Sequence, residues 1–304
     1  MSKKCIIAKE FKALIEEDGA TRAAINGYIL RKRAKNADMR KVVEAMAEYA
    51  WSLRDEHLLC ETLLLCDGAD IMRRLSDVTK EICGPEVWQK VFAGKQIPGI
   101  GTTLDEMNDF TLEMDRAFLA TAPREDYERA CEKVAHCWEP SWNPITHEEF
   151  LALGSIDALC DWLNAKTIAE LEQCRDKDEP FFNQMVDDEV IEYSKAHPNY
   201  YRKGDKLYVE KIPFLAKKFL AEPGGKMKRY YACHCPLARE SILREDGPVS
   251  RSFCHCSLGY SKKPFEAAFD RELTGRTVSV VFDEDCYQCV FEIDIPEDIL
   301  AMHT

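Results

Sequence analysis

Residues 229–264 read RYYACHCPLARESILREDGPVSRSFCHCSLGYSKKP and contain the unit Cys-His-Cys twice. The copies are Cys233-His234-Cys235 and Cys254-His255-Cys256, and they follow two strand-like runs, Arg229–Ala232 and Val249–Phe253. In an extended chain, residues i and i+2 point to the same face. Each copy would therefore present two thiols together and turn its histidine away. If the two strands lie side by side, four thiols can converge, so we expect the functional centre in this stretch.

A point where four thiols converge would suit a soft or borderline metal ion, and zinc is the metal that we expect. A closed site with four thiolates would be structural, whereas an open site with three protein ligands could be catalytic. An iron–sulfur cluster is an alternative, and four reduced core cysteines without metal are another. The expected ligands are Cys233, Cys235, Cys254 and Cys256.

A second interpretation needs no metal. Cys235 directly precedes Pro236, which can open a helix over 237–244. A thiol at a helix N-terminus has a lowered pKa, because the helix dipole and the unpaired amides favour the thiolate. Such a thiolate could attack an electrophile or exchange with a disulfide. The alternative function is therefore a thiol- or metal-dependent hydrolase or redox enzyme that uses Cys235 or Cys254, with His255 as the base.

Polar residues next to the cysteines in sequence could bind a small anionic ligand, although they also fit an ordinary charged helix surface. The candidates for this ligand site are Arg239, Glu240, Tyr260 and Lys263. Two further cysteines, Cys286 and Cys289, have the spacing Cys-x-x-Cys near the end of the chain. The alternation of apolar residues after them predicts that Cys289 faces the core.

The composition limits the partners and the compartment. The net charge of −13 argues against nucleic-acid and anionic-membrane surfaces, which bind clustered Lys and Arg. No apolar run approaches the ~20 residues of a membrane helix, and the apolar run near the N-terminus is too short for a signal peptide. We therefore expect a cytoplasmic protein whose partner is a small molecule. In that reducing compartment its 14 cysteines should be thiols or metal ligands.

The pattern of the chain predicts an α+β fold. Helical spacing and capping boxes such as Thr103 with Glu106 and Thr146 with Glu149 dominate the first part. Hairpins are predicted over 200–212 and near the C-terminus, with strands Thr277–Phe282 and Cys286–Ile295. We expect a helical domain over 1–180, packed on a cysteine-rich antiparallel α+β domain over 181–304.

The motif residues between 200 and 295 resemble those of an uncharacterised cysteine-rich bacterial protein family. The resemblance rests on Ala232-Cys-His-Cys-Pro-Leu-Ala-Arg-Glu240 and on Phe253-Cys-His-Cys-Ser257. The last ~50 residues, with Cys289-Val-Phe291, are more distantly similar to the vinyl-reductase-type small-molecule-binding domain and to the 2-amino-thiazoline-4-carboxylate hydrolase family. These resemblances imply an α+β domain that binds a ligand or a metal, beside a helical N-terminal part.

Overall fold

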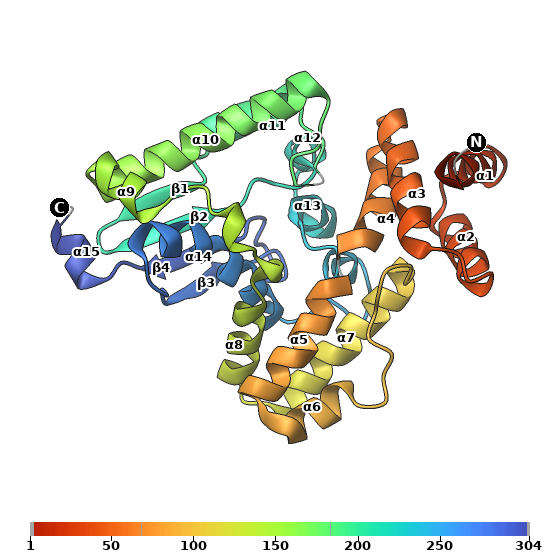
Figure 1. Ribbon diagram of the computed structural model, residues 1–304, viewed down its shortest axis with the longest axis horizontal. Coiled ribbons are helices and arrows are strands. Elements are labelled where there is room, and N and C mark those ends of the chain that lie inside the picture. Colours follow the sequence, from red (N-terminus) through yellow and green to blue (C-terminus); the bar gives the residue numbers. More distant parts are fainter. Residues whose placement is uncertain (1–2, 68, 183, 303–304) are drawn as a thin grey trace. The chain divides into compact units, whose positions relative to one another are not determined.

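The computed structural model describes residues 3–67, 69–182 and 184–302 (Figure 1). The chain divides into two compact units. Unit 1 consists of Met1–Thr121 together with the short segment Cys235–Ser241, and unit 2 consists of Ala122–His234 and Ile242–Thr304. The segment Cys235–Ser241 is thus grouped with residues more than a hundred positions earlier in the chain.

Unit 1 is helical. Its elements are α1 (Lys3–Asp18), α2 (Arg22–Ala34), α3 (Met39–Leu53), α4 (Glu56–Asp67), α5 (Ala69–Ile82), α6 (Gly84–Phe92) and α7 (Leu104–Thr121).

The predicted capping box at the start of α7 is confirmed. The amide of Glu106 donates to Thr103 Oγ1, and the amide of Thr103 donates back to the Glu106 carboxylate at 2.9 Å. The Glu106 carboxylate also binds the Arg33 guanidinium at 2.6 Å. This contact with Arg33 comes first among the causes that lower the pKa of Glu106 to about 2. The cap therefore also joins α2 to α7.

Unit 2 contains the remaining elements, together with short 3₁₀ turns. Its α-helices are α8 (Arg124–Val134), α9 (His147–Leu153), α10 (Ile156–Lys177), α11 (Asp188–Ala196), α12 (Ala216–Ala221), α13 (Gly225–Ala232), α14 (His255–Phe269) and α15 (Glu297–Met302). Its strands are β1 (Tyr200–Lys203), β2 (Lys206–Glu210), β3 (Gly275–Ser279) and β4 (Val290–Asp294).

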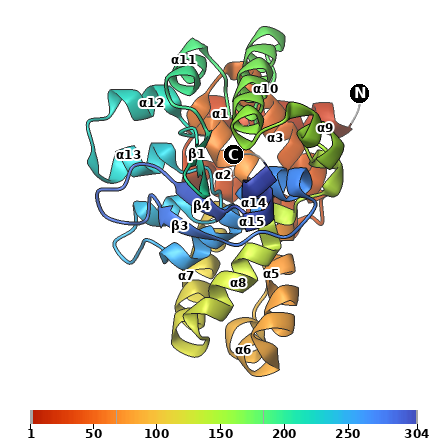
Figure 2. The same cartoon turned by 90° about the vertical axis from the view of Figure 1, so that its left-hand side faces the viewer.

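The four strands form one antiparallel sheet in the order β1-β2-β4-β3. Both predicted hairpins are therefore confirmed, β1 with β2 and β3 with β4, although the strands of the second are shorter than expected. Helices in the N-terminal part and a small antiparallel sheet in the C-terminal region confirm the α+β class. Figure 2 shows α14 beside β3 and β4, and these elements are in contact.

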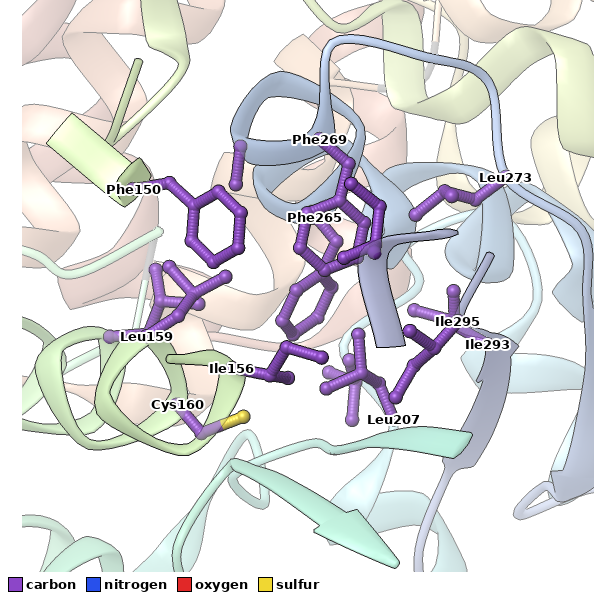
Figure 3. Close-up of a cluster of buried hydrophobic side chains, with 14 of the residues drawn as sticks. Phe150, Ile156, Leu159, Cys160, Leu207, Phe265, Phe269, Leu273, Ile293 and Ile295 are labelled. Carbon is purple, nitrogen blue, oxygen red and sulfur yellow. The ribbon is translucent and has the colours of Figure 1, made fainter. Parts of the chain in front are cut away.

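One face of the sheet carries the core of unit 2 (Figure 3). Leu207 and Ile293 are register partners on β2 and β4, and both are fully buried. Phe265 of α14 and Leu159 of α10 belong to the same apolar cluster. The opposite face is polar: Tyr208 donates to the Glu292 carboxylate at 2.8 Å. The sheet therefore has the alternation of a half-buried antiparallel sheet.

The predicted strands beside the two Cys-His-Cys units are wrong. Arg229–Ala232 is the last turn of α13, and Arg251–Cys254 is a 3₁₀ turn, η4, that leads directly into α14. A short apolar run has no periodicity that separates strand from helix, so its neighbours decide. Neither run belongs to the sheet. Helix α14 begins at His255, directly after η4, and continues through Pro264.

Within the described ranges, no helix is both long enough and apolar enough to cross a membrane. The longest of them is α10, with 22 residues, and several charged side chains interrupt it.

Candidate functional site

The first turn of α14 holds buried nucleophilic side chains. Cys254 ends η4, and Cys256 and Ser257 lie in the helix that follows; all three are buried. Residues i and i+2 of an α-helix lie about 200° apart around its axis. The two cysteines therefore do not share a face, as they would in an extended strand, and they contact different neighbours.

Cys254 contacts Cys289, the residue directly before β4. The thiol of Cys254 donates a hydrogen bond to the Cys289 sulfur, which also accepts one from the backbone of Val281. The carbonyl of Cys289 accepts the amide of Lys211, the residue after β2, at 3.1 Å. The 3₁₀ turn η4 and the ends of two strands thus hold two thiols together beside a lysine.

These contacts lower the pKa of the Cys289 thiol to about 7. The hydrogen bond from Cys254 contributes most, burial opposes it, and the Lys211 ammonium lowers the pKa further. In contrast, burial and then the charge of Asp283 raise the pKa of the Cys286 thiol. At neutral pH, about half of the Cys289 side chains would then carry the nucleophilic thiolate.

We expect the alkylation rate of Cys289 to rise with pH and to reach half its maximum near pH 7, because only the thiolate reacts. The charged or titratable groups around this thiol are Lys211, Cys254, Asp283 and Cys286. The measurement is the rate of iodoacetamide labelling at each cysteine from pH 5 to pH 10, followed by peptide mass spectrometry.

Cys160 is the control thiol in the same unit. Burial raises its pKa to about 12, with Asp157 and Asp161 adding to the effect, so it should remain unlabelled over the same range. A midpoint for Cys289 at about 8.5, the value of an unperturbed thiol, would contradict the prediction.

A chain of hydrogen bonds links Lys211 to His136. The Lys211 ammonium donates to Ser257 Oγ at 3.1 Å, and Ser257 Oγ lies 3.1 Å from His136 Nε2. Burial and then the charge of Lys211 together lower the pKa of His136 to about 3. In the tautomer whose Nε2 carries no hydrogen, the neutral imidazole accepts the Ser257 hydrogen while the hydroxyl oxygen accepts from lysine. These hydrogen bonds orient the Lys211 ammonium.

The backbone that carries His136 is in an unusual conformation. Ala135, His136 and Cys137 have φ values of 45°, 51° and 56°, all in the left-handed region. For residues with a side chain this costs about 1–2 kcal/mol each. The segment is held by packing of buried Ala135 and by the His136 amide, which donates to Cys256 Sγ at 3.3 Å. Such strain is concentrated at functional sites in proteins.

Aromatic rings lie next to this cluster. The ring of Tyr260 on α14 makes edge contacts with His136, Trp138 and Phe182, at centroid distances of 5.4, 4.9 and 6.3 Å. Phe182 is 64% exposed, and Trp142, which packs against Trp138, is 54% exposed. Tyr260, a predicted ligand residue, thus connects the buried polar cluster with solvent-exposed aromatic side chains.

The remaining predicted site residues of unit 2 have other neighbours. His255 Nε2 lies 3.6 Å from the Glu128 carboxylate, and burial lowers the pKa of this histidine. Lys263 binds Glu266 at 2.7 Å. Cys233 is buried at the end of α13, and the ring of His234 is hydrogen-bonded to the carbonyl of Ile212 at 2.6 Å. His234 therefore has a role in holding the backbone.

Cys235, Arg239 and Glu240 belong to unit 1. Arg22 of α2 binds the carboxylates of both Glu61 and Glu240, at 2.6 and 2.8 Å, and Arg239 lies 3.9 Å from Glu240. Arg239 is fully buried, and Glu61 and Glu240 are nearly so. This charge network stabilises the segment Cys235–Ser241 within unit 1.

The predicted zinc ligands are distributed over both units, because Cys235 belongs to unit 1 and the other three cysteines to unit 2. All four are present as thiols. Among the residues with described positions, no group of three or more His, Cys, Asp or Glu is arranged to hold a metal ion. Zinc binding stays a prediction that a measurement of metal content must test.

Local sequence patterns did not predict His136, Lys211 or Ser257 as site residues. They also did not predict that Cys289 contacts Cys254. His136 and Lys211 lie far from the cysteine motifs in sequence, and no local pattern marks them. Ser257 follows the second Cys-His-Cys directly and was not singled out. Cys289 was noticed as part of a Cys-x-x-Cys pair, but its contact with Cys254 joins residues 35 positions apart.

Comparisons of the chain with family models, curated proteins and solved structures find no significant match. The resemblances inferred from the motifs therefore stay predictions, and the arguments about function rest on the residues themselves.

Proposed function

We propose that unit 2 carries out thiol-dependent redox chemistry on a small molecule, with Cys289 as the attacking thiolate and Cys254 as the resolving thiol. The observation that supports this proposal is the hydrogen bond between two thiols beside the Lys211 ammonium. Two thiols in contact can form a disulfide, and a nearby cation favours the thiolate that starts the exchange. The sequence suggested Cys235 or Cys254 for such a role; this proposal keeps Cys254 and pairs it with Cys289.

The reaction would be an ordinary thiol–disulfide exchange. The Cys289 thiolate attacks one sulfur of a substrate disulfide R–S–S–R, so a new S–S bond forms as the old one breaks, and R–S⁻ leaves with the electron pair. Cys254 then loses its proton and attacks the Cys289 sulfur, which releases the second R–S⁻. The dithiol is oxidised to a disulfide, the substrate is reduced to two R–SH, and the two protons of the dithiol end on these products.

We expect bis(2-hydroxyethyl) disulfide, an acyclic R–S–S–R, to close one disulfide in the reduced protein, between Cys254 and Cys289. Intact mass spectrometry should show the loss of two hydrogens per chain, and peptide mapping should identify the pair. Cys254→Ser should leave Cys289 as a persistent mixed disulfide, because no thiol remains to resolve it. Cys289→Ser should abolish the reaction.

The matched control is Cys160→Ala, which removes a buried thiol from the same unit while leaving the proposed pair intact. This variant should close the disulfide as the wild type does. If Cys254 and Cys289 stay reduced while other cysteines oxidise, the redox function is wrong.

Zinc binding by Cys233, Cys235, Cys254 and Cys256 remains the competing proposal, and it shares Cys254 with the redox pair. Metal analysis of protein purified without chelator separates the two. About one zinc per chain that disappears in Cys254→Ser would favour the metal site. Metal-free protein with a reactive Cys289 would favour the redox function. Both proposals suit the reducing cytoplasm that we propose as the compartment.

A further inference from the structure

Four aromatic side chains of unit 2, which we call the aromatic surface, are linked by ring contacts: Trp138, Trp142, Phe182 and Tyr260. Trp138 contacts Trp142 and Tyr260 at centroid distances of 5.8 and 4.9 Å. Phe182 contacts Tyr260 at 6.3 Å. Of the aromatic residues that the structure describes, Trp142 and Phe182 are the two that are more than half exposed, at 54% and 64%. The exposed aromatic rings of unit 2 are thus gathered in one place.

The rings of the aromatic surface meet nearly at right angles, with interplanar angles of 79°, 77° and 88°. In such contacts the positive edge of one ring meets the negative face of another. Because Trp142 and Phe182 are more than half exposed, each also has ring surface open to solvent. The face of an aromatic ring attracts a cation, and tryptophan does so most strongly.

The backbone holds the ring of Phe182 in its exposed position. The φ of Phe182 is 46°, in the left-handed region, which is rare for a bulky side chain. Phe181 and Gln184 exchange two backbone hydrogen bonds, at 3.0 and 2.9 Å, and so close a tight turn around this residue. A strained conformation persists only where its surroundings fix it. The turn therefore keeps an aromatic ring in solvent that a relaxed loop could withdraw.

The two segments that carry the exposed rings, 138–144 and 177–182, are acidic. They contain three carboxylates and one ammonium, all on exposed residues: Glu139, Asp178, Glu179 and Lys177. Three negative charges against one positive charge leave these segments with a net charge of −2. Such a surface attracts a cationic ligand and repels an anionic one.

The exposed aromatic area is too small for a stable protein interface. Complete burial of two aromatic side chains removes about 300–500 Å² from solvent, and part of Trp142 and Phe182 is already covered. A stable interface needs about 800 Å² on each partner. The area instead matches a small molecule that covers two or three rings.

We infer that the aromatic surface binds a small organic cation of the quaternary or alkyl ammonium class. The ring faces attract the positive charge, and the carbon atoms around the nitrogen bury apolar area against the rings. The carboxylates of the two segments add a longer-range attraction. This site is separate from the proposed thiol chemistry and does not depend on it.

The test compares choline with 3,3-dimethylbutan-1-ol, a neutral molecule of the same shape in which carbon replaces the ammonium nitrogen. Binding is followed by the indole N–H resonances of the five tryptophans. We expect choline to bind about tenfold more tightly than the alcohol. The resonances of Trp138 and Trp142 should shift, whereas that of Trp162 in α10 should not. Added salt should weaken the binding of choline alone, a measurement that needs no variant.

Two variants remove a ring and keep an apolar side chain, Trp142→Leu and Phe182→Leu. Each should weaken choline binding about fivefold and binding of the alcohol less than twofold, because leucine has no ring face. The matched control is Tyr201→Leu on β1. The ammonium of Lys203 already lies over the Tyr201 ring, 4.9 Å from its centroid, so this variant should bind choline as the wild type does.

Two results would overturn the inference. If choline and the alcohol bind equally well, the aromatic surface is only an apolar patch. If choline binds but Trp142→Leu and Phe182→Leu leave its affinity unchanged, the cation site lies elsewhere. Neither result depends on the reactivity of Cys289, so the thiol function would stand in both cases.

Discussion

Replacing Gly259 with alanine should destabilise unit 2 by about 3 kcal/mol or more, at the upper end of the range for overpacking in a core. Gly259 lies in α14, where a Cβ would stand only 2.0 Å from the carbonyl oxygen of Glu132 in α8. The clash is with backbone, which cannot rotate away as a flexible side chain can. The measurement is the free energy of unfolding from urea denaturation.

The same substitution should also disturb the site. Close approach of α14 to α8 brings Ser257 within 3.1 Å of His136, which follows α8 directly. If α14 moves outward, the hydrogen bond that supports the Lys211 ammonium weakens, and the midpoint of Cys289 labelling should rise above pH 7.

Gly27→Ala is the control for the change of glycine to alanine in a helix. The nearest atom to its Cβ would be the guanidinium of Arg31, at 3.3 Å at the end of a flexible side chain. This variant of α2 should be neutral or more stable by up to about 1 kcal/mol, because alanine favours the helix. Equal stability losses in the two variants would show that the contact between α14 and α8 does not restrict position 259.

Arg22→Met should destabilise unit 1 by about 3 kcal/mol, the low end for breaking a buried ion pair, because the Arg22 side chain is 31% exposed. The variant leaves the buried carboxylates of Glu61 and Glu240 without this guanidinium. Glu240 is part of Cys235–Ser241, so that segment should loosen from unit 1. Urea denaturation gives the loss of stability, and faster alkylation of Cys235 reports the local opening.

Arg73→Met is the matched control in the same unit. Arg73 pairs with Asp70 on α5, where both side chains are more than half exposed. Exposed ion pairs of this kind contribute little to stability. We therefore expect the free energy of unfolding to change by less than about 0.5 kcal/mol and the alkylation rate of Cys235 to stay the same. If Arg22→Met behaved like this control, the buried charges would not hold the segment in unit 1.

Local sequence patterns were sufficient for the fold class and for several boundaries. The Thr103–Glu106 and Thr146–Glu149 boxes are both present, and the turn at Gly204 joins β1 and β2. Capping and tight turns involve residues three or four positions apart, so their chemistry can be read directly from the chain. The short apolar runs before the Cys-His-Cys units had no such signal, and their strand assignment was wrong.

The sequence by itself determined that unit 2 has antiparallel hairpins, and it pointed to Cys254 as a candidate reactive thiol. Only the tertiary structure decided that the thiol of Cys254 contacts that of Cys289. Cys254, Lys211 and Cys289 come together because β2 pairs with β4 in a particular register and α14 packs close to α8 at Gly259. Register and helix packing follow from buried side-chain contacts between distant segments, and no local spacing encodes them.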